Sequence, residues 1–419
     1  MNRFTTSWGT HQLARFPADP RDQLRAWDAA DEYLLSHLHG DADPELLPPG
    51  TPAAAPGGAV VLLGDRWGAL TTALAQLRPT QITDSHLGRE ATRANLAANA
   101  TADATASATA DPAANATPKA TADATADPAG IRLLTSTDPV PERIDLLVVR
   151  VPKSLAFLED QLHRLAPALH PGSTVIGAGM VTEVHTSTLQ LFERIIGPTR
   201  TSKALRKARL IFSTPAAAAE DRGANPWPLR YHLPEGIGVL SGRPVTNHAG
   251  VFCADRLDIG TRFLLDHLPQ HRGPQRVVDL GCGNGVVGTA AALANPAAEV
   301  TFIDESFQAL ASAEATFREN AGPDAPARFL AADALAADVP AGSVDLVLNN
   351  PPFHSHQATT DATAWRMFTG ARRALRTGGE LWVVGNRHLG YHVKLRRIFG
   401  NCETVAANPK FVVLRATKR

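Results

Sequence analysis

The sequence predicts an α/β fold built from two similar domains in tandem, each containing a mostly parallel sheet. In each half, strand-like apolar runs alternate with helix-like stretches, which is the pattern of βαβ units. The two halves also match one another segment by segment, which indicates an internal repeat. A chain of 419 residues is long enough for two domains with ordinary hydrophobic cores.

The repeat is carried by four pairs of segments that occur in the same order in both halves. The first run of each half is apolar and ends in a glycine turn, and the second ends in an acidic residue. The pairs are 59–64 with 277–281, 82–84 with 302–304, 144–149 with 344–348, and 169–177 with 375–383. Asp84 of the first half is thereby matched with Asp304 of the second.

In the second half, periodicity and turn residues define the expected elements. Strands are expected at 277–280, 299–303, 327–331, 344–348 and 379–384. Helices are expected at 286–294, 306–320, 362–376 and 391–399. The segments 402–406 and 410–415 flank a proline-containing turn and predict a terminal hairpin that adds an antiparallel edge to the sheet.

Composition shifts place the domain boundaries. Residues 1–213 are expected to form the first domain and residues 227–419 the second, with a linker rich in Ala, Pro and charge at 214–226. Residues 101–130 are dominated by Ala, Thr, Asp and Pro and hold no aromatic or large aliphatic side chain. Such a segment buries too little apolar surface to offset its ordering entropy, so we expect a disordered surface insertion.

Composition also excludes several classes of protein. Hydrophobic residues make up 44% and charged residues 20% of the chain, which is typical of a globular protein. No apolar run reaches the roughly 18 residues that span a bilayer, and the first residues lack the apolar stretch of a signal peptide. The three cysteines lack zinc-ligand spacing, so we expect reduced thiols, no metal, no membrane contact and a cytoplasmic location.

The charge balance limits how the protein could bind nucleic acid. Lysine plus arginine number 41, as do aspartate plus glutamate, so the surface as a whole is not basic. Two local runs remain as candidate patches, although each is also compatible with the solvated face of a helix. They are Lys203, Arg206, Lys207 and Arg209, and Arg387, Lys394, Arg396 and Arg397.

A glycine-rich loop at 279–285 closes a strand-like run and opens a helix-like one. Gly281, Gly283 and Gly285 permit a tight turn and let the backbone approach a ligand. The spacing Asp-x-Gly-x-Gly-x-Gly differs from the dinucleotide fingerprint Gly-x-Gly-x-x-Gly, which holds a pyrophosphate. Asp279 suits a cationic amino-acid group, so the loop favours S-adenosyl-L-methionine, which carries no phosphate.

Two further aspartates are expected to contact this cofactor. Asp304 ends the second strand, where a carboxylate can accept both ribose hydroxyls of a nucleoside. Asp333 follows the third strand and is placed to accept the adenine amino group. The alternatives are a helix N-cap for Asp304 and an ordinary turn residue for Asp333.

The sequence Asn-Pro-Pro-Phe at 350–353 follows the fourth strand, where such sheets bind their ligands. The Asn350 side-chain oxygen and the Pro351 carbonyl can accept the two N–H bonds of a planar amine and aim its lone pair at a methyl sulfonium. Phe353 offers a face for stacking a flipped base. These three residues are candidates for catalysis of N-methyl transfer, and a proline-rich turn with a core phenylalanine is the structural alternative.

Neighbouring residues complete the expected site. Pro352, His354 and Arg387 are assigned to contact with the substrate. His354 and His356 invite a metal interpretation, but no third clustered ligand accompanies them, so we expect no metal there.

The first half lacks an equivalent cofactor-binding loop and an equivalent of the Asn-Pro-Pro-Phe sequence. In its loop at 64–68, Arg66 and Trp67 would crowd a cofactor. Its fourth strand ends in Arg-Val-Pro-Lys at 150–153, without an asparagine or an aromatic residue. We therefore expect a degenerate domain that is retained for packing and substrate recognition.

Together these motifs resemble the ribosomal RNA guanine-N2 methyltransferases that contain a duplicated Rossmann-like, class I S-adenosylmethionine-dependent methyltransferase domain. The resemblance covers nearly the whole chain and is greatest to the large-subunit members, which act on 23S rRNA. It includes the segments 26–35, 151–153, 185–189, 257–260, 385–389 and 398–402. It implies S-adenosyl-L-methionine as the donor, a guanine of 23S rRNA as the substrate, and Phe252 and Asp258 on the cofactor side of the pocket.

The leading hypothesis is an enzyme that flips a guanine out of exposed rRNA and methylates its exocyclic amine directly, without a general base. We expect it to act as a monomer. The alternatives are a guanine of 16S rRNA, another planar amine such as that of adenine or of a protein glutamine, and a non-catalytic RNA-binding protein with a relic pocket.

Overall fold

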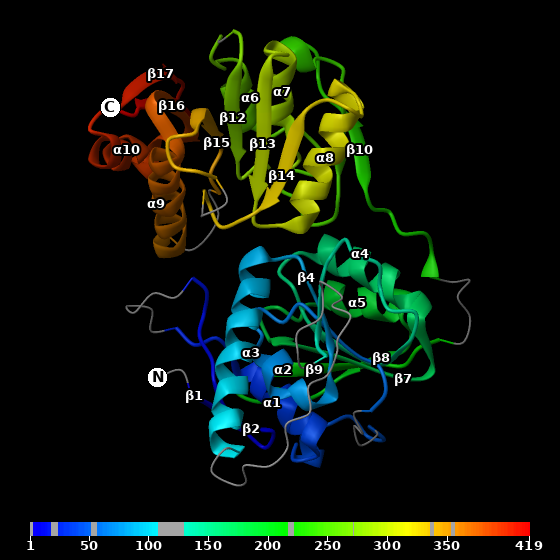
Figure 1. Cartoon of the computed structure of the whole chain (residues 1–419). Coiled ribbons are helices and arrows are strands. Elements are labelled where there is room, and N and C mark those ends of the chain that lie inside the picture. The colour runs from blue at the N-terminus through cyan, green and yellow to red at the C-terminus, as the bar shows by residue number, and fades with distance from the viewer. Residues whose placement is uncertain are drawn as a thin grey trace. The chain divides into compact units, whose positions relative to one another are not determined.

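The computed structural model describes residues 3–17, 24–51, 57–107, 130–216, 222–270, 272–335, 339–352 and 357–419. The chain forms two compact units, Met1–Pro226 and Trp227–Arg419 (Figure 1). Each unit contains a seven-stranded sheet, and the strands of the two sheets follow the same order. The prediction of two tandem α/β domains is therefore confirmed.

The sheet of the second unit has the strand order β14-β13-β12-β15-β16-β18-β17. Five of its strands run parallel: β12 (Gln275–Leu280), β13 (Ala298–Asp304), β14 (Ala327–Ala331), β15 (Val344–Asn349) and β16 (Leu375–Asn386). The expected terminal hairpin adds two antiparallel strands, β17 (Glu403–Ala407) and β18 (Phe411–Thr417). The parallel strands therefore all end at one edge of the sheet, which we call the carboxyl edge.

Helices cover both faces of this sheet, because successive side chains of a strand point to opposite faces. The face that carries Val278 and Val347 packs against α9 (Gln357–Ala374) and α10 (Tyr391–Phe399). The face that carries Val277 and Leu346 packs against three helices: α6 (Ile259–Leu265), α7 (Val286–Ala294) and α8 (Phe307–Ala321). The glycine-rich loop thus joins β12 to α7, as its sequence predicts.

The first part of the second unit contains elements that the sequence did not reveal. A hairpin of β10 (Leu229–His232) and β11 (Pro244–Asn247) lies against α8, where Thr246 N donates to Thr316 Oγ1 at 3.1 Å. Helix α6 then begins after Asp258. A helix of seven residues shows too little periodicity to be distinguished from a loop.

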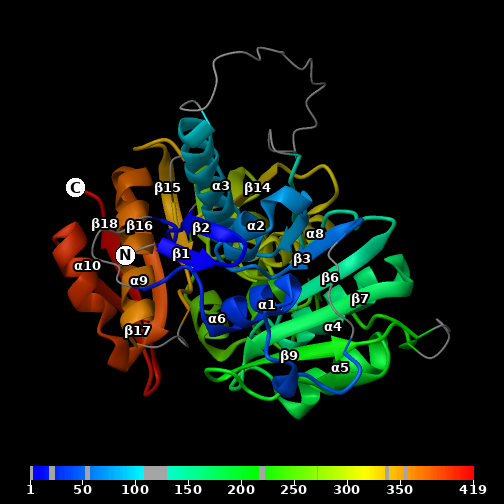
Figure 2. The same cartoon turned by 90° about the horizontal axis from the view of Figure 1, so that it is seen from below.

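The sheet of the first unit repeats this topology in the order β5-β4-β3-β6-β7-β9-β8. Its parallel strands are β3 (Val60–Leu63), β4 (Thr80–Thr83), β5 (Arg132–Thr135), β6 (Ile144–Arg150) and β7 (Leu169–Met180). The antiparallel edge is formed by β8 (Thr199–Thr201) and β9 (Ala208–Ser213). Figure 2 shows β6, β7 and β9 side by side.

Helices also cover both faces of the first sheet. Val60 and Leu62 pack against α1 (Ala29–His39) and α2 (Ala69–Ala73). Val61 and Leu63 face the opposite way, toward α4 (Leu155–Leu165) and α5 (Thr186–Ile195). A short hairpin, β1 (Arg3–Thr6) with β2 (Gly9–Gln12), precedes these elements.

The expected disordered insertion at 101–130 is wrong at its start. Helix α3 (His86–Ser107) continues through residues 101–107, because extending a helix that is already formed needs no new nucleation step. Residues 108–129 lie outside the described residues. The chain is described again from Gly130, just before β5.

Strand register shows which positions of the two units correspond. In the first unit Leu63 lies opposite Val149, and in the second Leu280 lies opposite Asn349. The residues that follow these partners also correspond, so Gly64 matches Gly281. By the same register Arg150 matches Asn350.

The register corrects one expected correspondence. Gly64 N donates to Ile82 O at 3.0 Å, and Gly281 N donates to Ile303 O at 2.8 Å. The residue after Ile82 is Thr83, so Thr83 and not Asp84 occupies the position of Asp304. The sequence comparison was displaced by one residue because it matched acidic side chains rather than backbone hydrogen bonds.

Arg150 is the largest fully buried side chain of the first unit and is 1% exposed. Its Nη2 pairs with Asp28 Oδ2 at 2.8 Å, its Nε lies 2.8 Å from Asp31 Oδ1, and its Nη1 donates to Ala178 O at 2.7 Å. Burial raises the pKa of Asp31 to about 6, although the guanidinium of Arg150 acts in the opposite direction. The charged form of Arg150 and the charged forms of Asp28 and Asp31 therefore stabilise each other.

Replacing Arg150 with methionine should lower the free energy of unfolding by about 3–5 kcal/mol, because the buried Asp31 carboxylate loses its counter-charge and the partly buried Asp28 loses one of its two cations. Urea denaturation of the full chain measures this change. Arg143→Met is the control, because the Arg143 side chain is 64% exposed in its ion pair with Asp145 and should contribute far less. Equal losses in the two variants would contradict the role given to Arg150.

Candidate active site

The glycine-rich loop lies at the carboxyl edge of the second sheet, between β12 and α7. Gly281, Gly283 and Gly285 have φ angles of 69°, 53° and 74°, in the left-handed region that glycine adopts without strain. A Cβ on Gly285 would lie 2.7 Å from the Cα of Ala313, so helix α8 packs directly against this position. A Cβ on Gly283 would meet nothing within 4 Å, so the loop faces open space there.

Asp304 fastens the loop to the end of β13. Its Oδ2 accepts the N–H of Gly283 at 2.9 Å, and its Oδ1 accepts the N–H of Ser306 at 3.0 Å. Burial raises the pKa of this carboxyl above its ordinary value. The backbone of Glu305 also donates to this carboxylate, so three of its about four acceptor positions are used and one remains for a hydroxyl group of a ligand.

Asp279 lies at the end of β12 and is 2% exposed. Its Oδ2 accepts the N–H of Gly288 in α7 at 2.7 Å. Burial raises the pKa of Asp279 to about 8, and the neighbouring Asp304 carboxylate acts in the same direction. A cation bound nearby would stabilise the charged form of this group.

Asn350 follows β15 and lies against the start of α6. Its Nδ2 donates to Thr261 Oγ1 at 2.9 Å and approaches Asp258 Oδ2 at 3.4 Å. Asp258 Oδ2 in turn accepts the backbone N–H of Thr261 at 2.8 Å and its hydroxyl at 3.2 Å. The first turn of α6 therefore holds the nitrogen side of the Asn350 carboxamide.

The oxygen side of the same carboxamide is differently placed. Asn350 Oδ1 is buried and has no hydrogen-bond partner among the described residues. An unsatisfied buried acceptor costs about 1–3 kcal/mol, and such groups mark positions where a ligand donor can bind. The adjoining Pro351 is buried and Pro352 is exposed, whereas Phe353 and His354 lie outside the described residues.

The remaining expected site residues, Asp333, Arg387 and Phe252, either contact other side chains and backbone groups or are exposed. Asp333 Oδ1 lies 3.4 Å from Arg366 Nη2, so a cation already accompanies this carboxylate. Arg387 follows β16 at the carboxyl edge, is exposed, and donates through Nη1 to Asn408 O at 3.3 Å. Phe252 is 54% exposed in the segment before α6.

Three residues at this edge were missed by sequence reasoning. Thr261 contacts Asn350, and Asp258 three residues before it is a helix-start signal that could have located α6. Asn349 is fully buried and donates to Leu280 O at 2.7 Å, which ties β15 to the strand that carries the loop. Asn284 Nδ2 donates to Asn247 Oδ1 at 3.0 Å and ties the loop to β11.

The first unit has no room for the same arrangement, because Arg150 occupies the position of Asn350. Its loop residue Arg66 pairs with Glu183 and lies 3.5 Å from Asp28. Asp84 accepts the hydroxyl of Ser136 at 2.6 Å, one position away from the site that Asp304 occupies in the second unit. The carboxyl edge of the first unit is thus filled by its own side chains.

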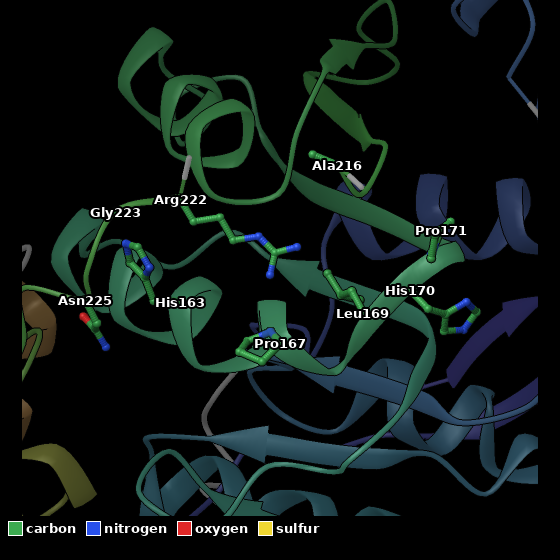
Figure 3. A pocket seen from close by; sticks show the side chains of 9 residues that line it. All are labelled: His163, Pro167, Leu169, His170, Pro171, Ala216, Arg222, Gly223 and Asn225. Atoms are coloured by element: carbon green, nitrogen blue, oxygen red, sulfur yellow. The ribbon is translucent and has the colours of Figure 1, made fainter. Parts of the chain in front are cut away.

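A pocket of about 520 Å³ lies elsewhere in the first unit, lined by His163, Pro167, Leu169, His170, Pro171, Ala216, Arg222, Gly223 and Asn225. Figure 3 shows the Arg222 side chain extending into it. Leu169 and His170 begin β7, so this pocket lies at the edge where the parallel strands start. It is therefore not the counterpart of the site that the glycine-rich loop and Asn350 form in the second unit.

The described residues offer neither a clustered metal site nor a membrane-spanning helix. In the part of the chain that the structure describes, no three His, Cys, Asp or Glu side chains gather in a group that could hold a metal ion. The helices of that part include none with the length and apolar character to cross a bilayer.

Comparison with known proteins places this geometry in a family. The methyltransferase small domain matches residues 242–415, and the RLMG N-terminal domain matches residues 1–119 and 103–217. The T. Thermophilus 16S rRNA N2 methyltransferase, solved in complex with AdoMet and guanosine, has a TM-score of 0.68 and 19% identity, covering 100% of this chain and 98% of that one. This likeness shows a shared fold of tandem Rossmann-like methyltransferase domains.

Two relatives are much more similar in sequence. The ribosomal RNA large subunit methyltransferase G of Streptomyces avermitilis is 66% identical over 415 residues, which is 99% of this chain and 99% of the relative. The protein of the same name from Ectopseudomonas mendocina is 46% identical over 419 residues, with 99% of each chain covered. The chain therefore belongs to the ribosomal RNA large subunit methyltransferase G family.

Proposed function

We propose that the second unit transfers the methyl group of S-adenosyl-L-methionine to the exocyclic N2 amine of a guanine in 23S rRNA. The observation that carries this proposal is the buried Oδ1 of Asn350, which has no hydrogen-bond partner among the described residues and lies just after β15, the strand next to the one that carries the glycine-rich loop. The names of the relatives identify rRNA of the large subunit as the substrate class for this family.

The loop and its aspartates fit the proposed cofactor. Gly281, Gly283 and Gly285 would pass along it without side chains, and open space lies over Gly283. Asp304 would accept a ribose hydroxyl, and the buried Asp279 would balance the charge of the amino-acid portion. When bound, S-adenosyl-L-methionine supplies a methyl group on a positively charged sulfur.

The remaining predicted cofactor contacts fit less closely. Asp333 would have to exchange its contact with Arg366 for the adenine amino group. Phe252, on the exposed segment before α6, would cover the cofactor side of the pocket. Asp258 contacts Asn350 rather than open space, so we assign it to holding the Asn350 side chain and not to binding the cofactor.

Asn350 and Pro351 would act on the amine that receives the methyl group. The lone pair of this amine is delocalised into the base, so the nitrogen is a weak nucleophile. Asn350 Oδ1 and the Pro351 carbonyl oxygen would accept its two N–H bonds, orient the lone pair and stabilise the positive charge that develops on nitrogen. The methylated amine is acidic and loses its proton to solvent, so no general base is assigned.

The residues around this clamp would hold the base. Phe353 would stack on it, as flipped-base pockets require. Pro352 is exposed beside the clamp and, with His354, would contact the nucleotide. Arg387, exposed at the same edge, would contact the RNA backbone.

The first unit would contribute RNA recognition rather than chemistry. Arg206 and Lys207 form the turn between Leu205 and Ala208, with φ angles of 49° and 65°. A left-handed conformation costs a residue other than glycine about 1–3 kcal/mol, and such strain persists mainly at functional sites. Both side chains are exposed; Arg206 pairs with Glu32 at 2.9 Å and would exchange this contact for a phosphate of RNA in the cytoplasm, whereas Lys207 would bind a phosphate directly.

Replacing Asn350 with alanine should reduce methyl transfer at least about 100-fold, because one of two acceptors for the amine is lost. A tritiated-methyl assay on rRNA measures the transfer. Calorimetric titration with S-adenosyl-L-methionine is the control and should give an unchanged affinity. Turnover close to that of the unaltered protein would exclude the clamp.

Cofactor binding should become tighter as the pH rises from about 6.5 to about 8.5, because Asp279, with a pKa of about 8, must lose its proton to balance a bound cation. Calorimetry in buffers of different ionisation enthalpy counts the protons released. The ligand's own amino group also titrates in this range, so Asp279→Asn is the control; it keeps an acceptor for Gly288. Equal proton release by both proteins would rule out this role.

Side-by-side labelling of purified 23S and 16S rRNA should place the methyl group in 23S rRNA, on guanine, because the relatives are named for the large subunit. Mapping the modified base separates guanine from adenine. Label in 16S rRNA alone would favour the alternative substrate. Calorimetry without any cofactor binding would favour a non-catalytic RNA-binding protein.

A further inference from the structure

Three side chains at the start of α6 and the end of β15 form a directed hydrogen-bond relay. Asp258 Oδ2 accepts the hydroxyl of Thr261 at 3.2 Å, and a carboxylate can only accept. The hydroxyl proton of Thr261 is therefore committed to Asp258. Thr261 Oγ1 is left with lone pairs only, and it accepts Asn350 Nδ2 at 2.9 Å.

This direction determines how the Asn350 carboxamide is oriented. If the amide were turned over, its oxygen would face the lone pairs of Thr261 Oγ1 and the carboxylate of Asp258, which is a repulsive arrangement of acceptors. With the nitrogen held by Thr261, the oxygen is the atom left buried and without a partner in the part of the chain that the structure describes. A free asparagine rotates between these two states, so the relay selects the one that can accept an amine.

The first unit contains the same contact between a helix start and a strand end, but charged groups form it. Asp28 is the N-cap of α1, as Asp258 is of α6, and Asp31 stands three residues on, as Thr261 does. Arg150, at the position of Asn350, contacts both of these carboxylates. In both units the helix start therefore contacts the residue at the carboxyl end of the fourth strand, which is the last residue of β6 in the first unit and the residue just after β15 in the second. The contact belongs to the duplicated fold, and its chemistry differs between the copies.

We propose that Thr261 and Asp258 are positioning residues for methyl transfer, which orient the Asn350 carboxamide through the directed relay so that its oxygen faces the substrate amine. The inference rests on the proposed function of this site. It assigns to Asp258 a role through Asn350 rather than a contact with the cofactor.

Thr261→Val is the first test, because valine keeps the shape of the side chain and removes the acceptor. The turnover number should fall about 10- to 100-fold, the range seen when a supporting hydrogen-bond partner is removed. The KM for S-adenosyl-L-methionine should stay within about two-fold. Thr261→Ser restores the hydroxyl and should recover most of the activity.

Thr289→Val is the matched control for burial. Thr289 lies in α7, is fully buried, and its hydroxyl has no partner among the described residues. Thermal unfolding of both valine variants is recorded beside their kinetics. Similar melting temperatures, with a loss of turnover in Thr261→Val only, support the relay.

Asp258→Asn tests the direction of the relay. Asparagine caps a helix about as well as aspartate, so α6 should keep its start. Its amide can donate as well as accept, so the hydroxyl of Thr261 is no longer committed and the Asn350 amide can turn over. Turnover should fall about 10-fold or more, with cofactor affinity unchanged.

The outcomes separate this inference from the function on which it rests. If the unaltered protein transfers no methyl group to either rRNA, the proposed function fails. If the unaltered protein is active and Thr261→Val matches it in turnover, the relay is excluded. A rise in the KM for the cofactor with unchanged turnover would also exclude it and would return Thr261 and Asp258 to the cofactor side.

Discussion

Each unit depends on a contact between the residue at the carboxyl end of its fourth strand and the aspartate that begins a helix of the layer covering the sheet. In a parallel α/β sheet the strand ends are where backbone groups and side chains are free to bind ligands. The contact fixes which side chain occupies that edge and how it is oriented. In the second unit it holds a neutral carboxamide, Asn350, against Asp258 and Thr261. The glycine-rich loop, bound to Asp304, borders the same edge.

The same contact between a helix start and a strand end leaves the carboxyl edge open to a ligand in the second unit and filled by side chains in the first. An amide held on one side leaves an oxygen for a ligand, whereas the guanidinium of Arg150 consumes the acceptors around it and fills the edge. The loops differ in the same sense, since Gly283 opens onto space and Arg66, at the corresponding position, is tied to Glu183. The two units thus share their strand order and their glycine turns but differ in the side chains that occupy the carboxyl edge.

Much of this was predictable from the sequence, and the limits have physical causes. The parallel strands of the second unit and the loop at 279–285 follow from local periodicity and glycine spacing, which require no knowledge of distant residues. Helix α6 was missed because seven residues carry little periodicity. The Thr261–Asn350 contact joins residues 89 apart in sequence, and the displaced match of Asp84 with Asp304 was settled only by strand register. Residues 101–107 were misassigned because composition without apolar residues was equated with disorder, although a helix formed by the preceding residues can continue through them.

The buried ion cluster of Asp28, Asp31 and Arg150 has a consequence for how the chain tolerates substitution. To gain an open edge, the first unit would have to replace the arginine and at least one carboxylate, and each change made alone leaves a charge buried without its partner. Changes at touching residues are not additive, so the effect of opening this edge cannot be reached as a sum of independent single substitutions. The same edge of the fold therefore tolerates substitution unequally in the two copies: a charged network must change as a set in the first unit, whereas a neutral carboxamide can change alone in the second.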